Sequence, residues 1–227
     1  MSGKFNQQAK KTARVHGLFV AALVLAGAFG TVNQAAAQRI TPPPTSITIT
    51  PPEGNVPFLL GHGVGTQGYT CLPTATGASW TVNPPRPEAT LFESFFGQDI
   101  QIITHFQSPD TNPNDAAPKP VPFGSATWQS AFDSSVVWAQ VLGPHFVVAG
   151  TEASCPHTGS INCLLLQSIG AKKGPAGGRL MTETTFIQRL NTNGGSAPVQ
   201  GCSVAGDVGK QTLVPYTADY FFYRAEK

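Results

Sequence analysis

The sequence predicts an all-β protein whose strands form an antiparallel β-sandwich, with a closed β-barrel as the alternative. About nine or ten short segments rich in β-branched and aromatic residues recur at intervals of roughly 8–15 residues, with Gly, Pro and Asn between them. The 227-residue chain holds 24 Gly and 20 Pro but only 11% charged residues, a composition typical of a loop-rich fold with few helices. No segment of about twelve residues shows a clear apolar period of 3.6.

The first 37 residues have the features of a secretory signal peptide. Four basic residues precede an apolar run at 18–29, which is too short to span a bilayer comfortably. Small residues at 35–37, directly before Gln38, offer a cleavage site. The alternative is an uncleaved membrane anchor, although glycines interrupt the apolar run. We therefore expect export to the periplasm or the extracellular medium, with no stable membrane span after cleavage.

Removal of this segment changes the charge of the chain. The whole sequence has a net charge of +2, from 14 basic and 12 acidic residues. Without the four basic residues of the signal, ten basic residues remain against twelve acidic ones, a net charge of about −2. No basic run beyond Lys172 and Lys173 survives, so nothing predicts a nucleic-acid partner. The rest divides into an extended, mobile Pro-rich leader at 38–44 and one domain at 45–227, long enough for a substantial core.

Four cysteines predict two disulfides in an exported chain. Three connectivities are possible. We favour Cys155–Cys163, which would close a short loop, and Cys71–Cys202, which would join an early strand to a late one and constrain the unfolded chain more strongly. A Cys/His metal site is the alternative, but the sequence has no Cys-x-x-Cys pair.

The first predicted strands are short and separated by turn residues. Alternating polar and apolar residues at 45–50 are consistent with a short strand. Apolar residues at 56–60 lead into 61–71, which have the pattern of a Gly-rich turn into a strand. A further strand at 79–82 is expected to stop at the two prolines at 84–85.

The middle of the chain predicts a hairpin followed by a long loop. Residues 91–96 and 98–106 have the pattern of two strands, with Gly97 between them. Five prolines with Asn and Asp among them make 108–122 a loop. Strand-like residues return at 136–141.

The C-terminal part ends in the most aromatic segment of the chain. Residues 164–169 form a buried apolar run, and a Thr-rich strand at 180–190 is turned by Asn and Gly at 193–195. The last segment, 213–223, carries three of the four tyrosines and has no helix-forming interior. We expect it to be a well-buried strand that closes the core.

Short motifs spread over 48–223 resemble a known family. They are Gly63-Val-Gly-Thr-Gln-Gly-Tyr-Thr-Cys71, Ser79-Trp80, Thr104-His105-Phe106, Thr127-Trp128-Gln129, Asp133-Ser-Ser-Val136, Phe186-Ile-Gln-Arg189, Thr192-Asn-Gly-Gly195 and Val214-Pro-Tyr-Thr-Ala-Asp-Tyr220. On these motifs the chain is similar to the family called domain of unknown function 3455, found in exported bacterial and fungal proteins. The last two motifs are the most specific.

The chain departs from the pattern of this family in places. The family usually has Gly-Pro before the Thr-Trp pair, where this chain has Gly124-Ser-Ala126, and usually has Gly where this chain has Ser134. The loop at 107–123 is also longer than usual. The resemblance implies export and a β-rich domain, and it supplies no catalytic residues. Fungal members often carry the label malate dehydrogenase, and this activity would require a dinucleotide-binding site in the sequence.

Three glycines formally fit the dinucleotide-binding fingerprint. Gly63, Gly65 and Gly68 have the required spacing, and Glu88 lies about 20 residues further on. The chemistry needs such glycines at a strand-to-helix turn, where helix amide groups meet the pyrophosphate. Here strand-like residues and Pro73 follow instead. We interpret the glycines as a tight turn or bulge that enters a strand, and we expect no cofactor.

Catalytic and metal-binding candidates are sparse. The histidines at 62, 105, 145 and 157 lack the close spacing of metal ligands, and no nucleophile elbow, zinc-protease helix or phosphate-binding loop is present. The weak catalytic candidates are His105 and Asp133, which would act together in a hydrolase. Asp219, between two tyrosines, is expected to accept a hydrogen bond from a tyrosine or a backbone amide.

Aromatic side chains indicate a ligand surface instead, although core packing is the ordinary role of each. Flat apolar rings with hydrogen-bonding edges bind sugars and other small ligands. Trp128, beside a long polar loop, is the aromatic residue that we expect to be exposed, with Gln129 and Tyr69 as further ligand-binding candidates. We therefore predict a non-catalytic envelope or extracellular module that binds a polysaccharide or an envelope protein. The alternative is a secreted hydrolase acting on a glycan or an ester.

Overall fold

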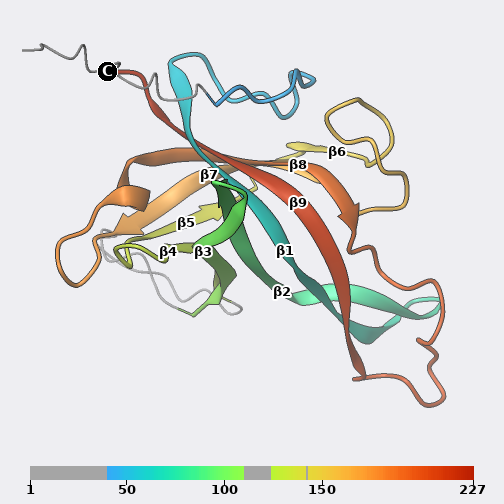
Figure 1. Ribbon diagram of the computed structural model, residues 1–227. Helices are drawn as coiled ribbons and strands as arrows, with labels where there is room; N and C mark the ends of the chain where they lie inside the picture. Colours follow the sequence, from blue (N-terminus) through green and yellow to red (C-terminus); the bar gives the residue numbers. More distant parts are fainter. Residues whose placement is uncertain (1–39, 110–123, 142) are drawn as a thin grey trace, which may run out of the picture. The chain divides into compact units, whose positions relative to one another are not determined.

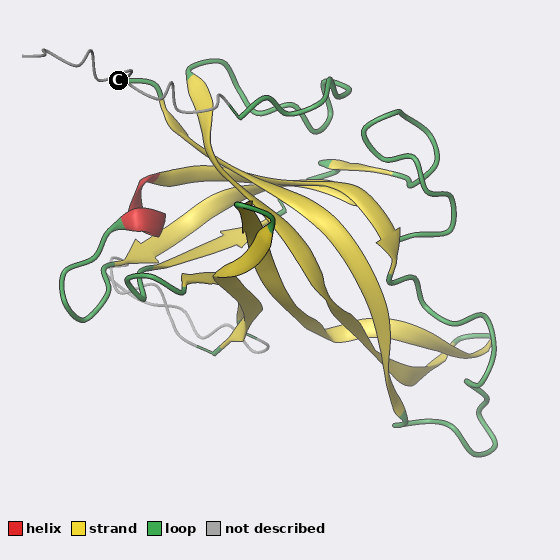
Figure 2. Cartoon of the chain, in the orientation of Figure 1, coloured by secondary structure: helices red, strands yellow, loops and turns green. Residues whose placement is uncertain are grey.

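Strands account for nearly all of the regular structure (Figure 2). The computed structural model describes residues 40–109, 124–141 and 143–227, so the predicted signal peptide and most of the predicted loop at 108–122 lie outside it. Within these ranges there is no α-helix, and the all-β prediction is confirmed. The elements are β1 (Asn55–Thr74), β2 (Gly77–Phe95), β3 (Gln98–Ser108), β4 (Ser125–Ser130), β5 (Val136–Gln140), β6 (Phe146–Val147), β7 (Cys163–Lys172), a 3₁₀ helix (Leu180–Glu183), β8 (Thr184–Gly194) and β9 (Gln211–Ala225).

Eight of the strands close into an antiparallel barrel (Figure 1). They pair in the order β5-β4-β3-β2-β1-β9-β8-β7, and β5 also pairs with β7, with Val136 opposite Lys172 and Gln140 opposite Gln167. The short β6 adds a further pairing to β7. Of the two predicted architectures the structure has the closed barrel, not the sandwich. Closure pairs both edges of the sheet, which a sandwich leaves open.

β9 lies between β1 and β8 and contributes to two apolar clusters (Figure 1). Tyr216, Tyr220 and Phe222 pack in the cluster inside the barrel, whereas Phe221 and Tyr223 pack in a second cluster on the outer surface. This alternation follows from the two-residue period of a strand. The prediction of a well-buried closing strand is confirmed.

The second cluster covers the outer face of β7, β8 and β9. Ile49 is fully buried there, and its carbonyl accepts a hydrogen bond of 2.7 Å from Nε2 of Gln188. The predicted strand at 45–50 is wrong. These residues form a turn, because the Ile49 amide donates to the carbonyl of Ser46 at 3.1 Å and none of the described strands pairs with the segment.

Glycines along β1 let the neighbouring strands come close. A Cβ atom at Gly63 would lie 2.8 Å from the Tyr220 ring, and one at Gly65 would lie 2.6 Å from Cα of Ala89. The turn predicted at the start of 61–71 is therefore wrong: the glycines of this segment lie in strand, between β2 and β9. The irregularity comes after Gly68, where the register with β2 shifts.

The predicted hairpin at 91–106 is confirmed as β2 and β3. Phe95 pairs with Gln98, and the two residues between them, Phe96 and Gly97, both have positive φ (49° and 77°), as in a tight two-residue hairpin. The predicted end of the preceding strand at 84–85 is wrong. β2 continues through these prolines because they fall where the register shifts, in a stretch without ladder pairing.

Both predicted disulfides are confirmed. Cys71–Cys202 joins β1 to the loop before β9, and Cys155–Cys163 closes the loop before β7. Cys71, Cys155 and Cys163 are fully buried, the latter two within the outer cluster. The first disulfide ties the far end of the β1–β2 hairpin to the start of β9.

Candidate functional site

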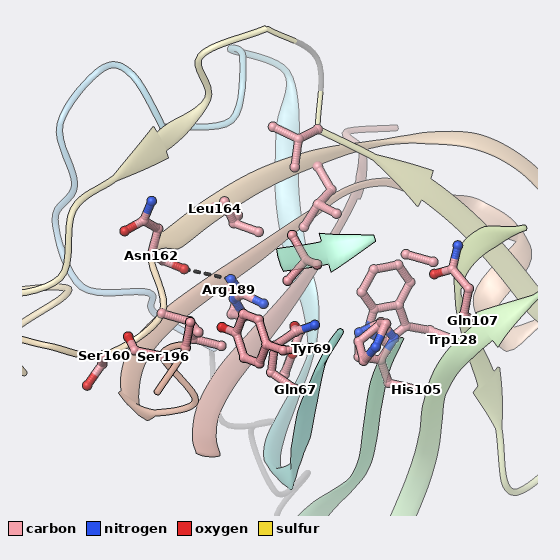
Figure 3. A pocket seen from close by; sticks show the side chains of 18 residues that line it. Gln67, Tyr69, His105, Gln107, Trp128, Ser160, Asn162, Leu164, Arg189 and Ser196 are labelled. Carbon is pink, nitrogen blue, oxygen red and sulfur yellow. Dashed lines mark hydrogen bonds between the residues drawn. The ribbon is translucent and has the colours of Figure 1, made fainter. Parts of the chain in front are cut away.

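The barrel contains a cavity of about 550 Å³ (Figure 3). Its lining combines residues from strands far apart in the sequence, from Gln67 of β1 to Tyr220 of β9. Val82 and Val141 belong to the lining and are also exposed to solvent, so the cavity is accessible from outside. The mouth of a β-barrel is a common place for a ligand site.

One wall of the cavity is a stack of aromatic rings. The His105 ring lies parallel to the Trp128 indole, with ring centroids 4.1 Å apart and planes 6° apart, and Tyr220 is tilted against both. Nδ1 of His105 donates to the carbonyl of Thr127 at 2.9 Å, which fixes the tautomer. Burial lowers the pKa of His105 to about 4, so this imidazole is neutral at pH 7.

The opposite wall is polar and holds a cation (Figure 3). Nη2 of Arg189 donates to the carbonyl of Asn162 at 2.7 Å, and Arg189 is only 9% exposed. Beside it, the Tyr69 hydroxyl donates to the carbonyl of Gly195 at 2.7 Å. Burial raises the pKa of Tyr69, although the charge of Arg189 opposes this shift, so the phenol also stays neutral.

The structure brings together two of the three predicted ligand-binding residues. Tyr69 and Trp128 line the cavity, whereas Gln129 is not part of the lining. The expected exposure of Trp128 is wrong, since this side chain is 1% exposed. Successive residues of β4 point to opposite faces of the sheet, and the barrel places Trp128 on the inner one. A surface platform formed by this tryptophan is therefore excluded.

The two predicted catalytic residues have separate environments. His105 lines the cavity, whereas Asp133 lies in the turn between β4 and β5 and does not. One Asp133 oxygen accepts hydrogen bonds from the amide and the hydroxyl of Ser135, at 3.0 and 2.7 Å. The other accepts from the amide of Leu180 at 2.9 Å. Asp133 thus joins this turn to the 3₁₀ helix, which is a structural role.

We expect Asp133→Asn to lower the free energy of unfolding by about 1–2 kcal/mol at pH 7. Burial acts to raise the pKa of this carboxyl, but the hydrogen bonds from Leu180, Ser135 and Ser130 together outweigh it and lower the pKa to about 2. Because the folded-state pKa lies below the unfolded one, the stabilisation is complete above about pH 4 and is lost as the pH falls towards 2. Urea unfolding at pH 7 and pH 2 measures both values. If Asp133→Asn lowered the free energy of unfolding equally at both pH values, the stabilisation would not come from the ionised carboxylate.

Asp219 has partners other than the predicted ones. Its carboxylate contacts Nδ1 of His62 at 2.6 Å and accepts a hydrogen bond from Nδ2 of Asn191 at 2.6 Å. The two neighbouring tyrosines, Tyr216 and Tyr220, instead bond to each other through their hydroxyls at 2.8 Å. The prediction of a tyrosine or backbone-amide partner is wrong, because the two tyrosine rings point into the barrel and the donor to Asp219 is the side-chain amide of Asn191.

The described part of the chain contains no cluster of three or more His, Cys, Asp or Glu side chains with the geometry of a metal site. His62 is paired with Asp219 on the exposed surface, whereas His105 is enclosed in the cavity, so these two histidines do not converge. No helix within the described ranges has the length and hydropathy needed to cross a membrane.

Arg189 is the residue of this site that sequence reasoning missed. It follows Ile187 by two positions in β8, and Ile187 packs inside the barrel. The two-residue period of a strand therefore predicts that Arg189 also points inward. The sequence feature that could have revealed it is a charged residue two positions after an apolar one in the same strand.

Comparison with known proteins identifies the family of this chain. Residues 52–224 match the family described as protein of unknown function (DUF3455). The chain belongs to the DUF3455 family. Neither the curated proteins nor the solved structures contain a match to it. Every residue that lines the cavity falls within the DUF3455 match.

The structure explains one departure of this DUF3455 member from its expected pattern. Ser134 stands where the family usually has glycine, and its φ is 57°, in the left-handed region that favours glycine. The turn between β4 and β5 keeps this conformation because Asp133 and Ser135 hold it with their hydrogen bonds. The substitution therefore leaves the turn intact.

Proposed function

We propose that this protein is an exported, non-catalytic binding module that holds one small organic molecule in the cavity of its barrel. The observation that carries the proposal is the cavity of about 550 Å³, lined mainly by apolar and aromatic side chains with a few buried polar groups. Ligand sites commonly have volumes of roughly 300–1,000 Å³ and this mixture of groups. Export is supported by the features of residues 1–37 and by the two disulfides.

The location of Trp128 favours a small ligand over a polysaccharide. A polymer bound along a surface needs exposed aromatic rings, whereas Trp128 is buried against His105 inside the barrel. An envelope protein as a partner stays a prediction. The alternative of a glycan hydrolase needs two carboxyl groups about 5–10 Å apart. Among the described residues that line this cavity there is no Asp or Glu, so the cavity favours binding.

Binding of a neutral fluorophore, N-phenyl-1-naphthylamine, tests this proposal. We expect a saturable rise in fluorescence with one site per chain, because the aromatic wall excludes water from the probe. Ala126 of β4 lines the cavity, and Ala126→Phe places a ring in the space the probe needs. The variant should bind the probe at least about 10-fold more weakly.

Ala205→Phe is the matched control. Ala205 is exposed in the loop before β9, and the same substitution there leaves the cavity unchanged. Circular dichroism and the Tm of both variants establish that they are folded. The proposal fails if the wild-type protein gives no saturable signal, or if folded Ala126→Phe binds the probe as tightly as the wild type does.

A further inference from the structure

Arg189 is a buried cation to which the described residues supply no opposite charge. The ion pairs in these ranges involve other residues, and no Asp or Glu among them lines the cavity. Its Nη2 is bonded to the carbonyl of Asn162, but its Nε is buried and has no hydrogen-bond partner among the described residues. A buried charge without an opposite charge beside it is costly in free energy, so Arg189 favours a ligand that brings a negative charge.

A second residue of the lining also has an unsatisfied donor. Nε1 of Trp128 is buried and, within the described part of the chain, has no hydrogen-bond partner. Trp128 and Arg189 come from β4 and β8, and both line the cavity (Figure 3). An indole N–H and a guanidinium can only donate, so both require acceptor atoms.

The surrounding groups limit the ligand to a single negative charge. His105, Tyr69 and Tyr216, three titratable side chains near Arg189, are all neutral at pH 7 because burial disfavours their charged forms. One guanidinium therefore balances one anionic group. A carboxylate carries that charge and matches the planar fork of arginine, whereas a phosphate dianion would leave one charge unbalanced in a largely apolar cavity.

The rest of the cavity fits an apolar body. Leu164 and Leu166 of β7 and Ile161 line it together with the Trp128 and His105 rings. We propose, on the basis of the small-molecule binding function above, that the cavity takes a monocarboxylic acid with an apolar body, whose carboxylate is bound by Arg189. The apolar part of the acid then packs between the aromatic stack and the aliphatic residues of β7.

A matched pair of ligands tests this proposal. 2-Naphthoate and 2-naphthamide share one ring system and differ in charge, and each can displace N-phenyl-1-naphthylamine. We expect the wild-type protein to bind naphthoate at least about 10-fold more tightly than naphthamide. Arg189→Gln should remove this preference by weakening naphthoate about 10–100-fold, with naphthamide changed less than about 3-fold. Arg179→Gln, at an exposed loop position, is the control and should behave as wild type.

The outcomes separate this inference from the proposed function. If neither naphthalene nor the neutral fluorophore binds, the proposed function fails, and this inference with it. If the fluorophore binds and both naphthalenes displace it equally, the cavity binds small molecules but the carboxylate assignment is overturned. A folded Arg189→Gln that keeps the preference for naphthoate also overturns it. Naphthoate should raise the Tm of the wild type but not of Arg189→Gln, which is a readout independent of the fluorophore.

Discussion

The double variant Cys71→Ala/Cys202→Ala is expected to lose about 5 kcal/mol of unfolding free energy. The disulfide closes a span of 131 residues, so its removal greatly increases the conformational entropy of the unfolded chain. In the folded protein it joins β1 to the loop that leads into β9, at the end of the β1–β2 hairpin. Urea unfolding of the oxidised wild type and of the variant, both at pH 7, measures the difference.

The second disulfide provides the control. Cys155–Cys163 spans 8 residues, and Cys155→Ala/Cys163→Ala should cost about 2.5 kcal/mol by the same relation. Both pairs include fully buried cysteines, so packing losses affect both variants. Equal losses for the two double variants would contradict the explanation through loop length. A Cys71→Ala/Cys202→Ala protein that is as stable as the wild type would contradict the role of this disulfide altogether.

Gly65→Ala should lower the free energy of unfolding by about 3 kcal/mol. Its new Cβ would overlap the carbonyl oxygen of Glu88 and lie 2.6 Å from Cα of Ala89, both backbone atoms of β2. Because β1 is paired on both sides at this point, the strand cannot move away without breaking hydrogen bonds to β9. Urea unfolding measures the loss, and the Tm gives an independent check.

Gly206→Ala is the matched control for this substitution. Gly206 lies in a loop and does not have positive φ, and no atom of the described residues lies within 4 Å of a new Cβ. Its replacement should therefore change stability by less than about 0.5 kcal/mol. The comparison also tests the dinucleotide fingerprint. If Gly65 contacted a pyrophosphate, alanine would weaken NADH binding and leave stability nearly unchanged, which is the opposite of our expectation.

Local patterns predicted most of the strands and both disulfides. The aromatic segment at 213–223 and the hairpin around Gly97 follow from residue types and turn chemistry, which act between near neighbours in the sequence. The errors at 45–50 and 84–85 share one cause. In each case the pairing partner, or the absence of one, depends on segments far away in the chain.

The candidate site was only partly predictable. Tyr69, Trp128 and His105 were singled out by residue type, but the sequence suggested an exposed Trp128 and a partnership between His105 and Asp133. Which face of β4 points inward depends on its register with β3 and β5, which the neighbouring polar loop does not reveal. Asp133 lies in the turn after β4, where hydrogen bonds from Ser135 and Leu180 occupy its two oxygens.

The sequence by itself determined the all-β class and the membership of the DUF3455 family, because these depend on composition and motifs. It favoured the cysteine pairing that the structure shows, but it left three connectivities possible. Only the tertiary structure decided between sandwich and barrel, since the two share the same alternation and differ in one long-range pairing, that of β5 with β7. The same closure encloses the cavity and buries Arg189 within it. The two-residue period of a strand predicts which side chains point inward, but only the closed sheet determines which residues surround them.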